Sequence, residues 1–357
     1  MAVPAPEAPS TGADHAAPAG GRPIAEILAW SRGLVDPALR AAVDGLPAST
    51  RHIAGYHFGW WDEGGRPTDA PAGKGIRPAL VLLAAQAVGG AAGLAVPAAV
   101  AVELAHNFSL LHDDVMDADG IRHHRPTVWR VFGANTAILA GDALQVLALD
   151  VLAASGHPAA TAGVRMLSAA VQELIEGQSA DLSFERRSDV TLAECRAMAL
   201  AKTGALLGCA GAIGASFGGG DPGQIRQLRR FGLDVGLAFQ HVDDLLGIWG
   251  DPAVTGKPVY SDLRGRKKSL PVVAALTSDS SAGRELAALY LRDRALSDAE
   301  RVHVAELIDI AGGRVWSRAE AARLLARALR QLSLVDPVPR PAAALETLAR
   351  MIVIRRH

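Results

Sequence analysis

The sequence predicts an all-α protein. Half of its residues are hydrophobic, only 4% are aromatic, and alanine dominates the long apolar segments. Runs rich in alanine and leucine, with few alternating β-branched residues, favour helix over sheet. A length of 357 residues allows one large helical domain or two smaller ones. We expect a single domain over residues 23–357.

Residues 1–22 differ from the rest of the chain in composition. They consist mainly of alanine, proline and glycine, with almost no large apolar side chains. Such a segment buries too little apolar surface to offset the entropy lost on ordering. We expect a disordered arm here. The arm has no continuous apolar core, so it does not indicate a signal peptide.

The composition also argues against several classes of protein. A net charge of −1 does not indicate a nucleic-acid-binding protein. Cys195 and Cys209 form no disulfide framework, which suits a reducing cytosol. Residues 79–102 carry no charge and are long enough to span a bilayer. Because Gly89-Gly90 predicts a turn inside that segment, we expect two buried helices, no membrane span and a cytoplasmic protein.

The helices can be placed in order. Ile24, Ile27 and Leu28 are spaced for one face of one or two helices over 23–46. Asp221-Pro222-Gly223 predicts a turn before a helix that starts at 224, and Gly250-Asp251-Pro252 ends that helix. Further helices are expected over residues 134–154, 161–185, 191–217 and from 270 to the end, including 319–334.

The apolar run over residues 107–117 ends in three carboxylates. If this run is helical, Asp113 and Asp117 lie on one face, where their like charges repel, with Asp114 beside them. A divalent cation would offset that charge, and magnesium completes its shell with water and substrate phosphate. A solvated helix end is the alternative interpretation. A second pair, Asp243-Asp244, favours the metal.

Cations lie close to both aspartate motifs. Arg122-His123-His124-Arg125 follows the first motif, and a segment containing Lys257, Arg264, Arg266, Lys267 and Lys268 follows the second. Arginine and lysine in these positions suit a metal-bridged phosphate gripped from both sides. Because an aspartate motif is followed by cations at both places, we expect two half-sites that face each other across a bundle. His123 and His124 as zinc ligands are an alternative, but no cysteine lies near them.

Two further cationic positions are weaker signals. In Gly73-Lys74-Gly75-Ile76-Arg77-Pro78 the glycines allow close backbone approach to an anion such as diphosphate, and Pro78 can open a helix. Lys202 lies inside an apolar helix, where a lysine is either snorkelling, paired or functional.

These motifs, in this order, resemble the trans-isoprenyl diphosphate synthases, a head-to-tail prenyltransferase family. The likeness is strong over residues 70–275 and weak elsewhere. Each motif alone is weak, but seven in order are specific. They are Gly73-Lys74 with Arg77-Pro78, Asp113 to Asp117 with Arg122, Gly177-Gln178 with Asp181, Lys202-Thr203, Phe239-Gln240 with Asp243-Asp244, Gly256-Lys257-Pro258, and Lys267 to Pro271.

The resemblance implies an isoprenoid-synthase helical bundle around a central apolar cavity, commonly a homodimer. It implies three magnesium ions, with manganese as a possible replacement, held by Asp113, Asp117 and Asp243 and supported by Asp114 and Asp244. The remaining implied roles concern substrates. Arg122, Lys202, Lys257 and Lys267 would hold an allylic diphosphate; Lys74, Arg77 and His106 would hold isopentenyl diphosphate; Thr203 and Gln240 would stabilise the allylic cation.

The chemistry agrees with these implied roles. Diphosphate leaves only when its charge is neutralised, and metals with nearby cations supply that neutralisation. The carbocation then needs a dry apolar cavity. We expect the released diphosphate to take the final proton, because the motifs offer no evident protein base.

Two positions depart from the family pattern. The family's second aspartate motif usually has a third aspartate where this chain has Gly247. The family also usually has a second arginine directly after Arg122, where this chain has His123. We expect activity to survive the first change. Because histidine is largely neutral near pH 7, the second predicts weaker or pH-dependent binding of isopentenyl diphosphate.

The length of the product should depend on the cavity floor. Phe108 precedes Asp113 by five residues, and its ring should stop elongation early, although Ser109 leaves space beside it. Leu104 and Ala105 lie one turn further down and can shift the result. The sequence predicts a C15–C20 product, farnesyl or geranylgeranyl diphosphate.

Other functions compete with this one. A class I terpene cyclase would need an Asn/Ser/Glu metal motif, and the region of Asp243 has none. A non-catalytic partner subunit would have lost the aspartates and cations that this chain keeps. The stretch from Ala29 to Asp62 is similar to actinobacterial prenyltransferases that are cargo of encapsulin-type shells. The arm is then either a docking peptide, which places the protein in a nanocompartment, or an inert tail.

Overall fold

The computed structural model describes residues 23–68, 73–252, 258–290, 292 and 294–353. Residues 1–22, where we expect the arm and its docking to a shell, lie outside these ranges. Lys257 of the predicted site also lies outside them. The described chain is almost entirely helical, and its named strands form one two-stranded hairpin. The all-α prediction is therefore confirmed.

The elements follow one another with short connections. The first half contains α1 (Ile24–Asp44), α2 (Ala48–His57), α3 (Ile76–Ala87), the 3-10 turn η1 (Ala92–Ala95), α4 (Val96–Met116), β1 (Ile121–Arg122), β2 (Arg125–Pro126), α5 (Val128–Phe132), α6 (Ala134–Ala153) and α7 (Ala160–Phe184). The second half contains α8 (Leu192–Ala199), the π-helical turn η2 (Leu200–Gly204), α9 (Ala205–Phe217), α10 (Pro222–Trp249), α12 (Ser261–Arg264), α13 (Leu270–Leu276), α14 (Ser281–Tyr290), α15 (Asp298–Ile310), α16 (Gly313–Ser333) and α17 (Pro339–Val353).

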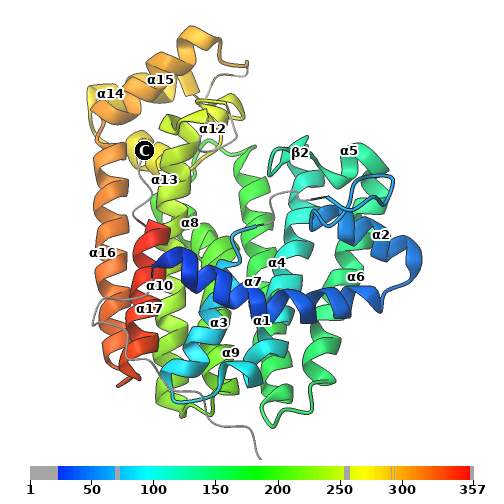
Figure 1. The fold of residues 1–357 in the computed structure, drawn as a ribbon. Helices are drawn as coiled ribbons and strands as arrows, with labels where there is room; N and C mark the ends of the chain where they lie inside the picture. The colour runs from blue at the N-terminus through cyan, green and yellow to red at the C-terminus, as the bar shows by residue number, and fades with distance from the viewer. Residues whose placement is uncertain (1–22, 69–72, 253–257, 291, 293, 354–357) are drawn as a thin grey trace, which may run out of the picture.

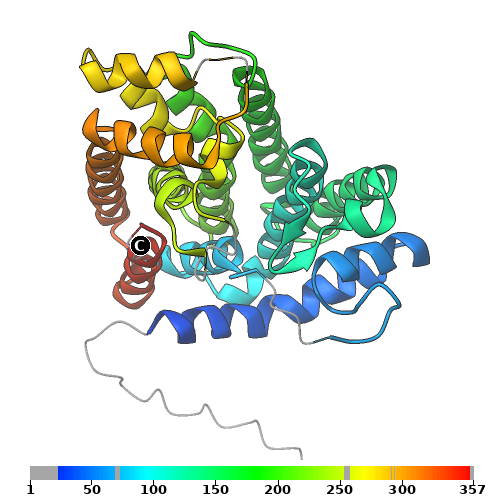
Figure 2. The same ribbon diagram turned by 90° about the horizontal axis from the view of Figure 1, so that it is seen from above.

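These helices build a bundle with α9 in its interior. Helix α9 packs against α3, α4, α7 and α10, and α10 packs in turn against α16. In Figure 1, α4, α6, α7 and α10 run roughly parallel while α1 crosses them, and Figure 2 shows α1 along one side of the bundle. A large hydrophobic cluster contains residues from α1 through α17, and a smaller one lies among α12 to α15.

Local chemistry explains where several helices begin. At the start of α10 the carboxylate of Asp221 accepts hydrogen bonds from the backbone N–H groups of Gly223 and Gln224, while the Gln224 side chain bonds back to Asp221. This capping box, with Pro222 in the first turn, ends the preceding loop. Thr191 and Glu194 form the same arrangement at α8. The sequence placed both helix starts within two residues of the observed ones.

Glycines let α9 lie directly on its neighbours. A Cβ atom at Gly211 would lie 2.2 Å from the carbonyl oxygen of Leu228, and one at Gly232 would lie 2.1 Å from that of Leu207. These four residues belong to the facing surfaces of α9 and α10. The two backbones therefore approach so closely that no larger residue fits at either glycine.

Three described segments are long and apolar enough to cross a membrane: Ala92–Met116, Ala134–Ala153 and Leu192–Phe217. The first and third are 67% and 78% buried inside the bundle, which accounts for their apolar composition. The expected pair of buried helices over 79–102 is present, because α3 and α4 flank η1 there. The middle segment, α6, is only 33% buried and keeps an exposed apolar face.

Replacing Gly232 by alanine should lower the free energy of unfolding by about 1–3 kcal/mol, because the added methyl group meets the backbone of α9. Gly33, an exposed glycine inside α1 with nothing within 4 Å of its Cβ position, provides the matched control. Gly33→Ala should stabilise the protein by about 0.5–1 kcal/mol. Urea unfolding of both variants measures the difference, and equal midpoints would contradict the close approach.

Candidate active site

The first aspartate motif lies at the end of α4. Asp114 is buried, and its Oδ1 accepts a hydrogen bond from Nε of Arg122 in β1 at 2.8 Å and forms an ion pair with Nη2 at 2.7 Å. Asp113 is partly buried and Asp117 is exposed. Within the described residues, the side chains of Asp113 and Asp117 make no hydrogen bond or ion pair. Burial raises the pKa of Asp113 to about 6, while the charge of Lys202 opposes that rise.

The second aspartate motif, on α10, repeats this division. Asp244 is buried; its Oδ1 accepts from Nε2 of Gln240 at 2.7 Å and its Oδ2 from the backbone N–H of Leu270 at 2.8 Å. Burial raises the pKa of Asp244 to about 7, although the charge of Lys267 opposes the rise. Asp243 is exposed and, among the described residues, has no hydrogen-bond or ion-pair partner.

Asp181 on α7 stands between the two motifs. Its Oδ2 accepts from Nζ of Lys202 at 2.7 Å and lies 3.9 Å from Nζ of Lys267. Lys202 acts electrostatically on Asp113, and Lys267 interacts with Asp243 and Asp244. The structure thus links α4, η2, α7 and α10 through a chain of alternating charges.

A glycine and a π turn make this chain of charges possible. A Cβ atom at Gly177 would lie 2.3 Å from the backbone nitrogen of Lys202, so α7 and η2 touch at this point. Lys202 and Thr203 both lie in η2, and π-helical turns often mark functional sites. Thr203 Oγ1 donates to Oε1 of Gln240 at 2.5 Å. Together with its bond to Asp244, this contact fixes which way the Gln240 amide points.

A second group of cations lies where α3, α4 and the hairpin meet. Burial lowers the pKa of Arg77 to about 10, but the carboxylate of Glu103 opposes this shift. Burial and nearby positive charges, first among them Arg77, lower the pKa of His106 well below its usual value. The pKa of His123 is also lowered, by burial and by Arg122. At neutral pH the arginines are therefore charged and both histidines are neutral.

Asn107 connects this region to α2. Its Nδ2 donates to the backbone oxygen and to Oε1 of Glu103, at 2.8 and 3.2 Å. Its Oδ1 lies 3.0 Å from Nε2 of His57. Burial, reinforced by the charge of Arg122, lowers the pKa of His57 to about 3, so His57 is neutral and donates this hydrogen bond.

The remaining predicted residues lie as follows. Lys74 is exposed just before α3, where Gly75 caps the helix with a left-handed backbone. Phe108 is buried, and its ring meets His112 edge-on at 5.5 Å. His123 and His124 both have positive φ, at 49° and 62°, in the turn between β1 and β2. Such backbone costs roughly 1–2 kcal/mol per residue.

The histidine and carboxylate side chains of this region differ in the metal ions they can bind. Within the described residues, no three histidine, cysteine, aspartate or glutamate side chains gather closely enough to hold a metal ion, which leaves the zinc interpretation of His123 and His124 without a third ligand. Asp113, Asp117 and Asp243 fit magnesium, because among the described residues they are the motif carboxylates that accept no hydrogen bond. Magnesium draws its other ligands from water and phosphate.

Sequence reasoning assigned no role to four residues of this region: His57, Glu103, Asn107 and Asp262. Glu103 carries a usable signal, because it is the first charge after the uncharged segment 79–102 and precedes Asn107 by one helical turn. The contact between His57 and Asn107 joins two distant helices and leaves no local pattern.

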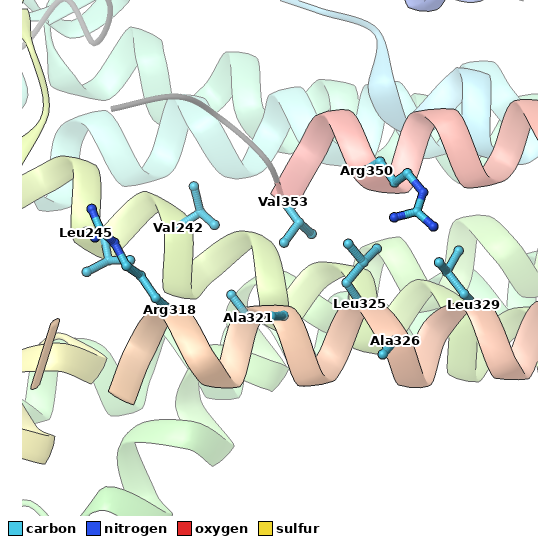
Figure 3. A pocket seen from close by; sticks show the side chains of 10 residues that line it. Val242, Leu245, Arg318, Ala321, Leu325, Ala326, Leu329, Arg350 and Val353 are labelled. Atoms are coloured by element: carbon cyan, nitrogen blue, oxygen red, sulfur yellow. The ribbon is translucent and has the colours of Figure 1, made fainter. Parts of the chain in front are cut away.

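A cavity of about 550 Å³ lies elsewhere, between α10, α16 and α17 (Figure 3). Val242 and Leu245 line it from a face of α10 that differs from the face carrying Asp243. Arg318 and Arg350 lie at its edges. None of the predicted site residues lines this cavity.

Comparison with known proteins agrees with the geometry of the site. A family model described as polyprenyl synthetase matches residues 66–308. The chain is 48% identical over 334 residues to the (2E,6E)-farnesyl diphosphate synthase of Mycobacterium bovis, covering 92% of this chain and 93% of the relative. It is 46% identical over 288 residues to the geranylgeranyl diphosphate synthase of Mycobacterium tuberculosis, covering 80% and 82%. The crystal structure of polyprenyl synthetase from Streptomyces coelicolor A3(2) superposes with a TM-score of 0.89 at 48% identity, covering 93% of this chain and 100% of that one.

The helical bundle and its paired aspartates define a prenyltransferase. The chain belongs to the polyprenyl synthetase family. The resemblance drawn from the sequence motifs is thereby confirmed, and the interpretations as a terpene cyclase or a non-catalytic partner are not favoured.

The buried, neutral His57 predicts a specific dependence of stability on pH. Its pKa is about 3 in the folded protein, while the usual value of 6.5 holds in the unfolded chain. The unfolded state therefore binds more protons between these values, and His57 makes stability fall as the pH drops below 6.5. His57→Gln should reduce the slope of unfolding free energy against pH by about 1 kcal/mol per unit. Identical slopes for both proteins between pH 6.5 and 4 would contradict a neutral His57.

Proposed function

We propose that the protein condenses isopentenyl diphosphate with an allylic diphosphate to give a short trans product, farnesyl or geranylgeranyl diphosphate. One observation carries the proposal. In each aspartate motif one carboxylate is bonded within the protein, while Asp113, Asp117 and Asp243 have no hydrogen-bond partner among the described residues. Asp113 lies near Lys202, and Asp243 lies near Lys267. Carboxylates and lysines in this arrangement suit a diphosphate held through divalent cations.

Prenyl synthases of this family use magnesium. We assign two ions to Asp113 and Asp117 and a third to Asp243, with manganese as a replacement. Bound magnesium neutralises the charge of the leaving diphosphate. Asp114 holds Arg122, and Asp244 holds Gln240, so these two carboxylates position neighbouring groups and leave the ions to the other three.

The allylic diphosphate is assigned to Arg122, Lys202, Lys267 and, outside the described residues, Lys257. Asp181 pairs with Lys202 and lies near Lys267, so it directs both ammonium groups to the same place. This clustering favours an anion with several oxygens, because each lysine donates up to three hydrogen bonds.

Isopentenyl diphosphate is assigned to Lys74, Arg77, His106 and His123. Glu103 supports the charge of Arg77, and the neutral histidines donate hydrogen bonds without repelling the arginine. His123 therefore contributes a hydrogen bond and no charge at neutral pH, which predicts weaker diphosphate binding than an arginine would give.

Thr203 and Gln240 are assigned to the allylic cation. Their mutual hydrogen bond orients oxygen dipoles, and dipoles fixed before the reaction stabilise developing positive charge without reorganisation. The released diphosphate accepts the proton lost after bond formation.

A magnesium-dependent condensation assay tests this function. Labelled isopentenyl diphosphate, offered with dimethylallyl, geranyl and farnesyl primers, should give products that stop at C15 or C20. Phe108→Ala should shift the products to longer chains, because removing the buried ring opens space along α4. Phe132→Ala, which removes a ring that packs on Tyr56 in the α2–α5 region, should leave the length unchanged. Elongation with none of the primers would overturn the function, and unchanged lengths in Phe108→Ala would overturn the role of the ring.

We also propose that two copies of the chain associate through α6. Leu139 and Val146 are 67% and 68% exposed on this apolar helix, and Ile138 is 40% exposed. A second copy would cover this face with an equivalent one, as two-fold dimers do. The protein would then act as a cytoplasmic homodimer.

Leu139→Arg should shift the protein toward monomer by placing a charge at the centre of this face. Val315→Arg, on a valine 67% exposed in α16, is the matched control and should leave the mass unchanged. Sedimentation equilibrium measures both variants. A dimer that survives Leu139→Arg would place the interface elsewhere.

A further inference from the structure

The space beside Gly247 is occupied by another carboxylate. A Cβ atom at residue 247 would lie 2.4 Å from Cγ and Oδ2 of Asp262 and 2.5 Å from its Oδ1. These distances are far shorter than any real contact of a Cβ atom. The carboxylate of Asp262 therefore fills the position where a side chain at residue 247 would begin.

Short-range contacts fix α12 against α10 at this point. Ser261 Oγ donates to the carbonyl oxygen of Gly247 at 3.1 Å, and the N–H of Tyr260 donates to that of Ile248 at 3.3 Å. The backbone of Asp262 accepts from the N–H of Lys267 at 2.9 Å. Asp262 is thus held on both sides, by α10 and by the segment that carries Lys267.

The Asp262 carboxylate belongs to the charged group around the second aspartate motif. Residue 247 follows Asp243 by four positions, so the two lie on one face of α10, one turn apart. Asp262 lies close enough to Asp244 and Lys267 to interact electrostatically with both. Lys267 is therefore surrounded by Asp181, Asp262, Asp244 and Asp243.

We propose that Asp262, reaching across from α12, supplies the third carboxylate of the second aspartate motif in place of the side chain that Gly247 lacks. Glycine is required at 247 because only the absence of a Cβ atom leaves room for this carboxylate. Asp262 is a positioning residue: it holds Lys267 and adds negative charge one turn from Asp243. The inference rests on the proposed function, because it assumes that Asp243 binds a divalent cation.

An exchange of the two positions tests the proposal. Asp262→Ala should weaken the binding of Mn²⁺, titrated with inorganic pyrophosphate present, by about tenfold, as removal of a supporting carboxylate commonly does. Gly247→Asp alone should lower the melting temperature, because its Cβ collides with Asp262. The double variant, Gly247→Asp with Asp262→Ala, should relieve that collision and recover Mn²⁺ affinity to within about threefold of wild type. Asp279→Ala, which removes an exposed carboxylate between α13 and α14, is the charge-matched control and should bind Mn²⁺ as wild type does.

The outcomes separate this inference from the proposed function. A double variant that is folded and yet binds Mn²⁺ no better than Asp262→Ala would overturn the replacement, as would wild-type affinity in Asp262→Ala. Asp243→Ala must itself weaken Mn²⁺ binding; if it does not, the metal assignment and the inference fail together. If the exchange restores Mn²⁺ binding while the wild-type protein condenses no primer, the replacement stands and the proposed function falls.

Discussion

The ion pair between Lys202 and Asp181 is the contact on which the geometry of the site depends. Both side chains are largely buried, at 17% and 14% exposure, and an unpaired charge in such a place would cost several kcal/mol. The pair forms only because Gly177 lets the backbone of α7 touch η2. It brings Lys202 opposite Asp113 and gives Lys267 a shared partner. The two halves of the site are thus joined through a carboxylate that is not itself a proposed metal ligand.

Permanent and neutral groups have different roles around this centre. The arginines provide charge, while His57 and His106 are kept neutral by burial and by the arginines themselves. Neutral imidazoles can donate and accept hydrogen bonds without adding to the repulsion among cations. The region between α2 and α4 can therefore be densely polar and still remain folded before any anion arrives.

Local sequence patterns predicted the helices well because helix starts and apolar faces depend on residues that are close in sequence. The turn at residues 221–223 and the apolar runs placed α7, α8 and α10 within two residues of their observed starts. The motif spacing also identified the family. Tertiary contacts were less accessible: whether Lys202 was snorkelling or paired was left open, since Asp181 comes from another helix. Likewise Asp262 meets Gly247 only after α12 folds back on α10. Neither segment carries a local pattern that predicts this contact.

The π turn at η2 has a consequence for helical phase. A π turn holds one residue more than an α turn, so the helix that leaves it is rotated by about 100° relative to the one that enters. Helix α8 faces α7 and α13, whereas α9 directs its glycines to α10 and α3. One inserted residue thus lets the continuous helical segment from α8 through η2 to α9 direct different faces to two sets of neighbouring helices. The place where the alignment changes is the place where Lys202 and Thr203 enter the site.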